Sequence, residues 1–536
     1  SVTVEGHYKP EVFAADRLAM LPEVLMLKVA DSPMRYDRKG VTAAFAPDAL
    51  PMTATGWRTS KDYDRCKGYV DVRLGSWLNS SVSAGYNAIR NEDTRLNVYL
   101  QHNSTSLWQA WKENADAGIP AADRRFRYDE TIGADLQQKI GYAGVLTAAA
   151  QYHLGYFNYY GTDSGSSKEG RISAPTQTLN DVYVKAGWTG PDIGKLSYGA
   201  DAEVRYFGYR SMYLPLPGTE GKLAADRGSR ETELNIGGNV RYKTGKNAQI
   251  EVNVRYSGVI NAVGNNVNRG ELIPAYVFSR KSLSLRLGLN AAVTGNGERT
   301  RFRIAPDVML SARKGIVAFS ASAGGGTHLR TLAWAHTYDY YSDPGTGCYR
   351  AAYTPVDARI AVQLNPGGRW TFGVDGAWRT TIDETFGGYY QALLNGTMLP
   401  GNAFPEGGRI HGFSLGVNAG YDFCRYISLK GKGTWQPQDG SKGYFNGFDR
   451  AAFTAEVSAE SRPIDKLIIG LCYRLRAKRL LLSDNISRLD LKGDYRITDR
   501  ISVGAELNNL LNRHEEMLPG LPLEGFNLTG GVQITF

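Results

Sequence analysis

The end of the chain alternates strictly between apolar and polar residues. From Gly525 to Phe536 it reads GFNLTGGVQITF and stops on an aromatic residue. On a β-strand, such a period of two places apolar side chains on one face and polar side chains on the other. The apolar face holds Phe526, Leu528, Val532, Ile534 and Phe536, opposite Asn527, Thr529, Gln533 and Thr535. A polar inner face and an apolar outer face are typical of an outer-membrane barrel strand.

The same alternation recurs along the chain. Residues 232–242, 250–256, 283–289 and 488–496 each place Leu, Ile, Val or Tyr on one face. Asn, Ser, Glu, Asp, Lys and Arg occupy the other face of these segments. Charges of both signs therefore keep to one side of each predicted strand.

Counting such segments predicts about 22 strands, an even number within the range of bacterial barrels. Residues 34–48 alternate poorly, and 80–104 could form two strands. The predicted strands are 34–48, 66–76, 80–104, 128–140, 142–160, 177–188, 194–211, 230–243, 247–262, 269–279, 281–295, 299–312, 315–330, 354–364, 368–382, 409–424, 426–437, 449–461, 464–476, 485–496, 500–512 and 524–536. We expect an all-β fold, a single transmembrane antiparallel β-barrel.

The connections alternate between short and long. Long connections fall near 106–126, 161–175, 212–229, 331–353, 383–408 and 513–523, with short turns between them. Short periplasmic turns and long extracellular loops are the usual outer-membrane arrangement, which puts the C-terminus in the periplasm. Trp77, Trp188 and Trp370 each lie beside a short connection. We expect them to mark the periplasmic aromatic girdle.

Composition is compatible with this fold. Hydrophobic residues make up 42% of the chain, and the mean hydropathy is -0.34. No run approaches the roughly 18 apolar residues of a spanning helix. No secretion signal opens the sequence, so we expect the mature form of an exported protein. The net charge of +9 comes from basic residues interleaved with Asp and Glu, which argues against a nucleic-acid partner.

The last fifty or so residues resemble the closing strands of TonB-dependent outer-membrane receptors. The resemblance rests on the strand that ends in LNNLLN at residues 507–512, the loop with Pro519 and Gly520, and the terminal strand that ends in Phe536. It implies that Phe526, Leu528, Val532, Ile534 and Phe536 belong to the signal read by the barrel-insertion machinery. It covers directly about a tenth of the chain, and the strand count extends it to the whole barrel.

The sequence departs from that family at its beginning. The resemblance implies an N-terminal plug domain, whereas only residues 1–33 precede the first possible strand, too few for a typical domain. We therefore expect residues 1–33 to form a periplasmic or lumenal segment without a plug domain, and residues 34–536 to form the barrel. A lumen of about 22 strands is normally filled. The N-terminal segment, inward-folded loops or another polypeptide could fill it.

These expectations lead to a non-enzymatic subunit of an outer-membrane transport or envelope-assembly complex. The alternative is a passive porin or a nutrient transporter plugged by a separate chain. The expected partners are the lipid bilayer, lipopolysaccharide and other outer-membrane or surface proteins. Of the four cysteines, Cys66 and Cys348 should lie toward the outer rim, where they could pair. We expect Cys424 to lie near the periplasmic turns and Cys472 to point into the lumen.

Two aromatic loop segments are candidate partner or ligand sites. The first, WAHTYDYY, contains Trp334, Tyr338, Tyr340 and Tyr341, and the second, FGGYY, contains Phe386, Tyr389 and Tyr390. Clustered Tyr and Trp suit protein hot spots or sugar stacking. Packing of the loops on one another over the barrel mouth explains these aromatics equally well.

A third hypothesis, an outer-membrane hydrolase, ranks last. The G-x-S-x-G match at residues 412–416 lies within an alternating strand, whereas that nucleophile requires a tight strand-to-helix turn. The seven His residues include no H-E-x-x-H spacing. We expect no catalytic residue, no cofactor and no metal site.

Overall fold

The computed structural model describes residues 67–107, 125–158, 176–215, 223–262, 265–338, 340, 350–384, 388–394, 397–403, 408–424, 426–437, 451–479, 485–513, 515–518 and 521–536. One sheet of 22 strands dominates this part of the chain. Its strands are β1 (Gly68–Gly75), β2 (Ser80–Arg90), β3 (Thr94–Leu107), β4 (Arg125–Lys139), β5 (Val145–Asn158), β6 (Thr176–Thr189), β7 (Leu196–Tyr209), β10 (Arg230–Lys243), β11 (Ala248–Asn261), β12 (Val267–Arg280), β13 (Leu283–Gly295), β14 (Thr300–Lys314), β15 (Val317–Arg330), β16 (Arg350–Leu364), β17 (Trp370–Glu384), β20 (Gly408–Cys424), β21 (Ile427–Trp435), β22 (Ala451–Ile464), β23 (Leu467–Arg479), β24 (Ile486–Arg496), β25 (Ile501–Asn508) and β28 (Asn527–Thr535).

Smaller elements occupy the connections. Three two-stranded sheets pair β8 (Ser211–Pro215) with β9 (Leu223–Arg227), β18 (Gly388–Leu394) with β19 (Thr397–Ala403), and β26 (Glu516–Leu518) with β27 (Leu521–Pro522). The described helical elements are α3 (Leu332–Tyr338) and the 3₁₀ turns η1 (Ser76–Leu78) and η3 (Gly141–Ala143). No helix among the described residues is long and apolar enough to cross a membrane.

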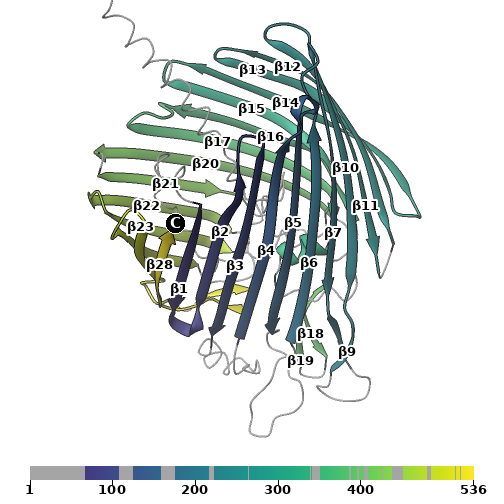
Figure 1. Cartoon of the computed structure of the whole chain (residues 1–536). Coiled ribbons are helices and arrows are strands. Elements are labelled where there is room, and N and C mark those ends of the chain that lie inside the picture. Colours follow the sequence, from purple (N-terminus) through teal and green to yellow (C-terminus); the bar gives the residue numbers. More distant parts are fainter. Residues whose placement is uncertain are drawn as a thin grey trace, which may run out of the picture. The chain divides into compact units, whose positions relative to one another are not determined.

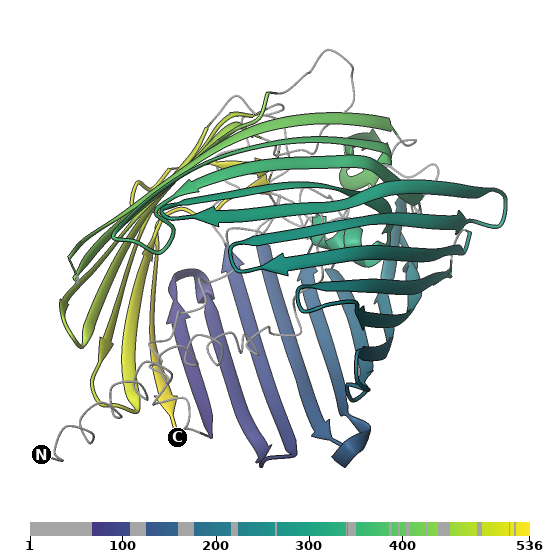
Figure 2. The same cartoon turned by 90° about the horizontal axis from the view of Figure 1, so that it is seen from above.

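The sheet closes on itself. Each strand pairs antiparallel with its neighbours, and the first strand pairs with the last, so that Val72 of β1 lies opposite Val532 of β28. Figure 1 shows β1 and β28 side by side, and Figure 2 shows the same strands from above. Closure leaves no open sheet edge, as a membrane-spanning sheet requires. The predicted closed antiparallel barrel of 22 strands is confirmed.

Side-chain exposure follows the predicted alternation. In β13, Leu287 and Leu289 are about half exposed, at 47% and 54%, and face the surface that meets lipid. Arg286 on the other face donates to Glu251 at 2.6 Å and to Asp307 at 2.8 Å. Apolar groups therefore point outward, and paired charges point into the lumen.

The first predicted strands are divided differently in the structure. Residues 34–48 lie outside the described residues. Residues 80–104 form two strands, as the two-strand alternative predicted, because the chain turns at residues 91–93 between β2 and β3. The Asn91 side chain stabilises this turn, because its Oδ1 accepts hydrogen bonds from the backbone N–H of Asp93 at 3.0 Å and from that of Thr94 at 2.5 Å. Asn favours such turns through this hydrogen bond.

The strand directions assign each connection to a rim. β28 ends at the C-terminus, on the periplasmic rim. Because β1 is antiparallel to β28, it begins at the periplasmic rim and ends at the extracellular rim. Trp188 at the end of β6 and Trp370 at the start of β17 lie on the C-terminal, periplasmic rim. The predicted position of Trp77 is wrong, because η1 joins β1 to β2 at the opposite, extracellular rim. A short connection is not confined to the periplasmic side, as the tight turn at residues 296–299 between β13 and β14 also shows.

Candidate functional site

The loop that follows β15 begins with a helix anchored to a distant strand. Helix α3 opens at Thr331, whose hydroxyl accepts the N–H of Trp334 at 3.1 Å, as N-cap threonines do. The carboxylate of Glu231 in β10 accepts the N–H groups of Leu332 and Ala333 at 2.7 and 2.8 Å. These N–H groups have no partner within the helix. One buried side chain of β10 therefore holds the start of α3.

His336 of α3 lies in an aromatic cluster contributed by β5 and β7. Its Nδ1 shares a 2.9 Å hydrogen bond with the Tyr209 hydroxyl. Its ring centroid lies 5.5 Å from that of Phe207 and 6.4 Å from that of Phe157. Burial, followed by the nearby His153, Arg127 and Arg205, holds the pKa of His336 well below its usual range. The imidazole is therefore neutral in the packed segment.

Tyr340, just beyond α3, contacts a third region of the wall. Its hydroxyl donates to Asp129 of β4 at 2.8 Å. The Arg127 guanidinium stacks on its ring, 3.6 Å from the ring centre, a cation–π contact. The rings of Phe157 and His336 lie 4.8 and 4.6 Å from it.

These contacts lie on the lumenal face of the barrel. Asp129, Phe157, Phe207 and Glu231 all occupy the positions that alternate with the exposed apolar residues of their strands, and all are nearly fully buried. Residues 331–338 and 340 follow β15 and contact β4, β5, β7 and β10. We call residues 331–340 the lumenal segment. It covers part of the lumen wall toward the extracellular rim.

The structure describes the positions of some of the aromatic residues predicted as binding sites. Trp334 lies in α3, and the Arg330 guanidinium stacks on its ring at 4.6 Å. Tyr338 ends α3, and its side chain lies outside the described residues, as do Tyr341 and Phe386. Tyr389 and Tyr390 belong to β18, which pairs with β19. Trp334 and Tyr340 thus contact residues of the barrel strands.

The wall residues of this cluster are not among those predicted from the sequence. Phe157 and Phe207 occupy lumenal positions at the extracellular ends of β5 and β7, where the pattern predicts polar side chains. Both are fully buried, with 0% and 1% of their surface exposed. An aromatic residue on the polar face of a barrel strand is the signal that could have revealed a covered patch.

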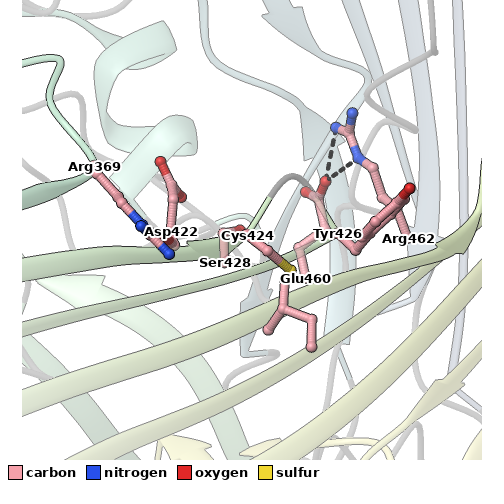
Figure 3. Close-up of a pocket in the computed structure, with 8 residues that line it drawn as sticks. Arg369, Asp422, Cys424, Tyr426, Ser428, Glu460 and Arg462 are labelled. Atoms are coloured by element: carbon pink, nitrogen blue, oxygen red, sulfur yellow. Dashed lines mark hydrogen bonds and ion pairs between the residues drawn. The ribbon is translucent and has the colours of Figure 1, made fainter.

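A pocket lies at the periplasmic rim between β20, β21 and β22 (Figure 3). Its arginines are held by neighbouring acceptors. Arg462 bonds to Glu460 at 2.8 and 2.9 Å, and Arg369 donates to the backbone carbonyls of Asp422 and Phe423. Cys424 is a free, exposed thiol here, and its place near the periplasmic turns agrees with the sequence prediction.

The described residues contain no group of three or more His, Cys, Asp or Glu side chains that could hold a metal ion. The terminal apolar residues are arranged as a lipid-facing stripe on β28 and its two ends: Phe526, Leu528, Val532, Ile534 and Phe536 are all exposed. The ring of Phe536 stacks at 6.3 Å on that of Tyr86 in β2. Their role as an insertion signal remains a prediction.

No family model and no curated protein matches the chain, whereas solved barrels do. One is the ferric enterobactin receptor PfeA of Pseudomonas aeruginosa (mutant G324V), with a TM-score of 0.67 and 14% identity over 88% of this chain and 80% of that chain. The FrpB iron transporter of Neisseria meningitidis (F5-1 variant) gives 0.64 and 13%, over 88% and 82%. The siderophore receptor PirA of Acinetobacter baumannii gives 0.66 and 12%, over 88% and 80%. At these identities the similarity concerns the fold. The chain is an outer-membrane β-barrel with the fold of TonB-dependent receptors.

Proposed function

We propose that this barrel is a subunit of an outer-membrane complex for transport or envelope assembly, and that its lumen is closed in part by its own lumenal segment. The proposed lumenal function is non-enzymatic. The observation that supports this closure is the anchoring of the lumenal segment to three distant strands, through Glu231 of β10, Tyr209 of β7 and Asp129 of β4. A lumen of 22 strands conducts freely unless something fills it.

Ion pairs on the lumenal face of the barrel support a polar occupant of the lumen. Arg205 and Asp181 pair at 2.7 Å, and Arg286 bonds to both Glu251 and Asp307. Such paired side chains present both donors and acceptors along the wall, which suits another polypeptide segment better than an apolar solute. The remaining closure is therefore assigned to a partner or to another part of this chain.

Single-channel conductance of the purified full chain in planar bilayers tests closure. We expect the wild type to show small, infrequent openings. The double variant Glu231→Ala with Tyr340→Phe removes two anchors of the lumenal segment and should open more often. The matched control, Glu92→Ala with Tyr142→Phe, changes the same residue types in exposed periplasmic turns and should behave as the wild type. A large, stable, non-selective conductance of the wild type would favour a passive porin.

Partners are tested by purification of the native chain in mild detergent. Stoichiometric co-purification of another envelope protein supports the complex. A chain that is monomeric in the native membrane, as measured by cross-linking before extraction, counts against it.

A nutrient transporter plugged by a separate chain is the second candidate. It is supported by the fold similarity to proteins described as a ferric enterobactin receptor, an iron transporter and a siderophore receptor. Because one fold hosts many functions, this candidate is tested by a binding measurement. Binding of a ferric siderophore to the purified chain, lost when the lumenal arginines are replaced, would favour this candidate.

A further inference from the structure

A hydrogen-bonded chain of Ser80, His102 and Glu130 lies on the outer face of the barrel. The Ser80 hydroxyl lies 3.0 Å from His102 Nε2. The other ring nitrogen, Nδ1, bonds to a carboxylate oxygen of Glu130. A serine hydroxyl on one imidazole nitrogen and a carboxylate on the other is the arrangement that activates serine as a nucleophile.

The pairing register places all three side chains outward. His102 of β3 lies opposite Val82 of β2 and Glu130 of β4. The next outward row toward the periplasm holds Leu100 and Ile132, which are 42% and 55% exposed. The side chains of His102 and Glu130 are 23% and 46% exposed. The group is therefore open to the lipid side and not to the lumen.

Strand length places the group near the outer lipid interface. β3 starts at Thr94 on the periplasmic rim, and His102 is eight residues further along. About 9 to 11 tilted residues cross the hydrocarbon core. The aromatic rings of Phe126, Tyr128 and Tyr156 cluster directly beyond Glu130, with centroids 5.1 to 6.2 Å apart. Aromatic residues mark the headgroup level, and lipid ester groups lie just beneath it.

We propose that Ser80, His102 and Glu130 form a serine esterase site that acts on acyl esters of outer-leaflet lipids. Ser80 Oγ attacks the ester carbonyl carbon while His102 Nε2 takes its proton. Collapse of the tetrahedral intermediate breaks the ester C–O bond, and the leaving alcohol takes that proton from His102. Water then attacks the acyl-serine with His102 as base, which releases the fatty acid and returns the proton to Ser80. Glu130 is a positioning residue that orients the imidazole.

Neighbouring groups suit this substrate. The Ser104 hydroxyl lies 2.6 Å from Ser80 Oγ and donates to the Leu78 carbonyl at 3.4 Å; in the proposed site it turns to donate to the oxyanion of the attacked carbonyl. Leu74 and Leu78 are 65% and 67% exposed and provide an apolar surface for an acyl chain. Leu78 and Trp77 both hold positive φ angles, 53° and 60°, a strain that occurs often at functional sites.

This activity is independent of the proposed lumenal function and departs from the expectation of a non-enzymatic chain. The sequence concealed the group because its members come from three strands. His102 and Glu130 also break the rule that polar residues face the lumen.

Labelling by a fluorophosphonate probe, followed by peptide mass spectrometry, tests the nucleophile. We expect the probe to modify Ser80 of the wild type in vesicles, and Ser80→Ala to abolish labelling. His102→Gln should slow it about 10²- to 10⁴-fold. His411→Gln is the matched control, because His411 also faces outward, bonded to Thr380 at 3.1 Å, and it should leave labelling unchanged. Heat-modified gel mobility verifies that each variant is folded. Absence of label from Ser80 in the folded wild type overturns the proposal.

Hydrolysis assays identify the source of the ester. Vesicles of phospholipid alone and vesicles with lipopolysaccharide in the outer leaflet are offered separately, and the released fatty acid is quantified. Release from either, lost in Ser80→Ala, supports the site and names its substrate. Glu130→Gln should lower kcat by about 10²-fold or more with little change in KM. Ser104→Ala should lower kcat by about 10²-fold. If the wild type and Ser80→Ala release equal amounts of fatty acid from both kinds of vesicle, the proposed esterase site is contradicted.

Discussion

The Tyr340 hydroxyl donates a hydrogen bond to the Asp129 carboxylate at 2.8 Å, although 211 residues separate them in the chain. Tyr340 follows β15 and α3, whereas Asp129 belongs to β4, so the hydrogen bond joins the loop to a strand that its own strands do not pair with. The same tyrosine ring carries the Arg127 guanidinium. This relationship fixes the far end of the lumenal segment.

Replacing Tyr340 by Phe should loosen that end while the packing of the ring is retained. A hydrogen bond to a charged group contributes about 1.5 to 3 kcal/mol, so the released state should become roughly tenfold or more populated. Limited proteolysis from the extracellular side measures release. Tyr142→Phe, in a fully exposed periplasmic turn, should leave cleavage unchanged. Equal cleavage of Tyr340→Phe and the wild type would show that the hydrogen bond does not hold the segment.

Acid should release the lumenal segment through His336. Its lowered pKa keeps the packed imidazole neutral, whereas in the released segment His336 titrates near the ordinary value of about 6.5. The released state therefore binds more protons below about pH 6.5, and the packed state loses up to about 1.4 kcal/mol per pH unit as the pH falls. Above that pH the contribution is constant. Conductance measured between about pH 7.5 and 5 should rise on acidification.

His336→Gln should flatten this pH dependence, because glutamine does not titrate. His411→Gln, at an outward position on β20, should retain it. A pH response that is the same in wild type and His336→Gln would assign the effect to other groups.

A charge should be tolerated on one face of β13 and not on the other. Leu289→Arg places a guanidinium against hydrocarbon and should destabilise the barrel by about 2 to 4 kcal/mol near the midplane. Asn290→Arg, one residue further, points into the polar lumen and should cost much less. Urea unfolding in lipid vesicles compares the two. Equal losses of stability would argue against the assigned faces.

The terminal aromatic residue should matter for assembly more than for final stability. Phe536→Ala removes the last residue of the proposed insertion signal, and we expect slower insertion by reconstituted barrel-assembly machinery. Phe302→Ala removes another lipid-exposed aromatic away from the terminus, 65% exposed against 50% for Phe536, and should insert at the wild-type rate. Equal insertion rates of the two variants would remove Phe536 from the signal.

The barrel could be predicted from sequence because each lipid-facing strand repeats one local rule. Leu287 and Leu289 face outward with Arg286 between them, and that pattern is visible without any partner strand. Trp77 was misplaced because a short connection does not by itself reveal its rim. The strand direction that decides the rim depends on the pairing of β1 with β28.

The lumenal segment's contacts and the group of Ser80, His102 and Glu130 could not be predicted, because residues distant in the sequence form them. Glu231 meets α3 about a hundred residues later in the chain, and no local pattern records that contact. His102 and Glu130 belong to strands whose alternation assigns polar side chains to the lumen. Each lies two residues from an outward apolar residue, Leu100 or Ile132, but only the register of β3 against β2 and β4 shows that the three side chains meet.

Lipid contact along β13 distinguishes the two faces of the barrel wall. Single cysteines at positions 283 to 293, in a background without the native cysteines, would carry an environment-sensitive fluorophore in vesicles that contain brominated lipid. We expect strong quenching at 283, 285, 287, 289, 291 and 293, and weak quenching at the positions between them. Uniform quenching, or quenching confined to the intervening positions, would contradict a barrel with an apolar outer face and a polar lumen.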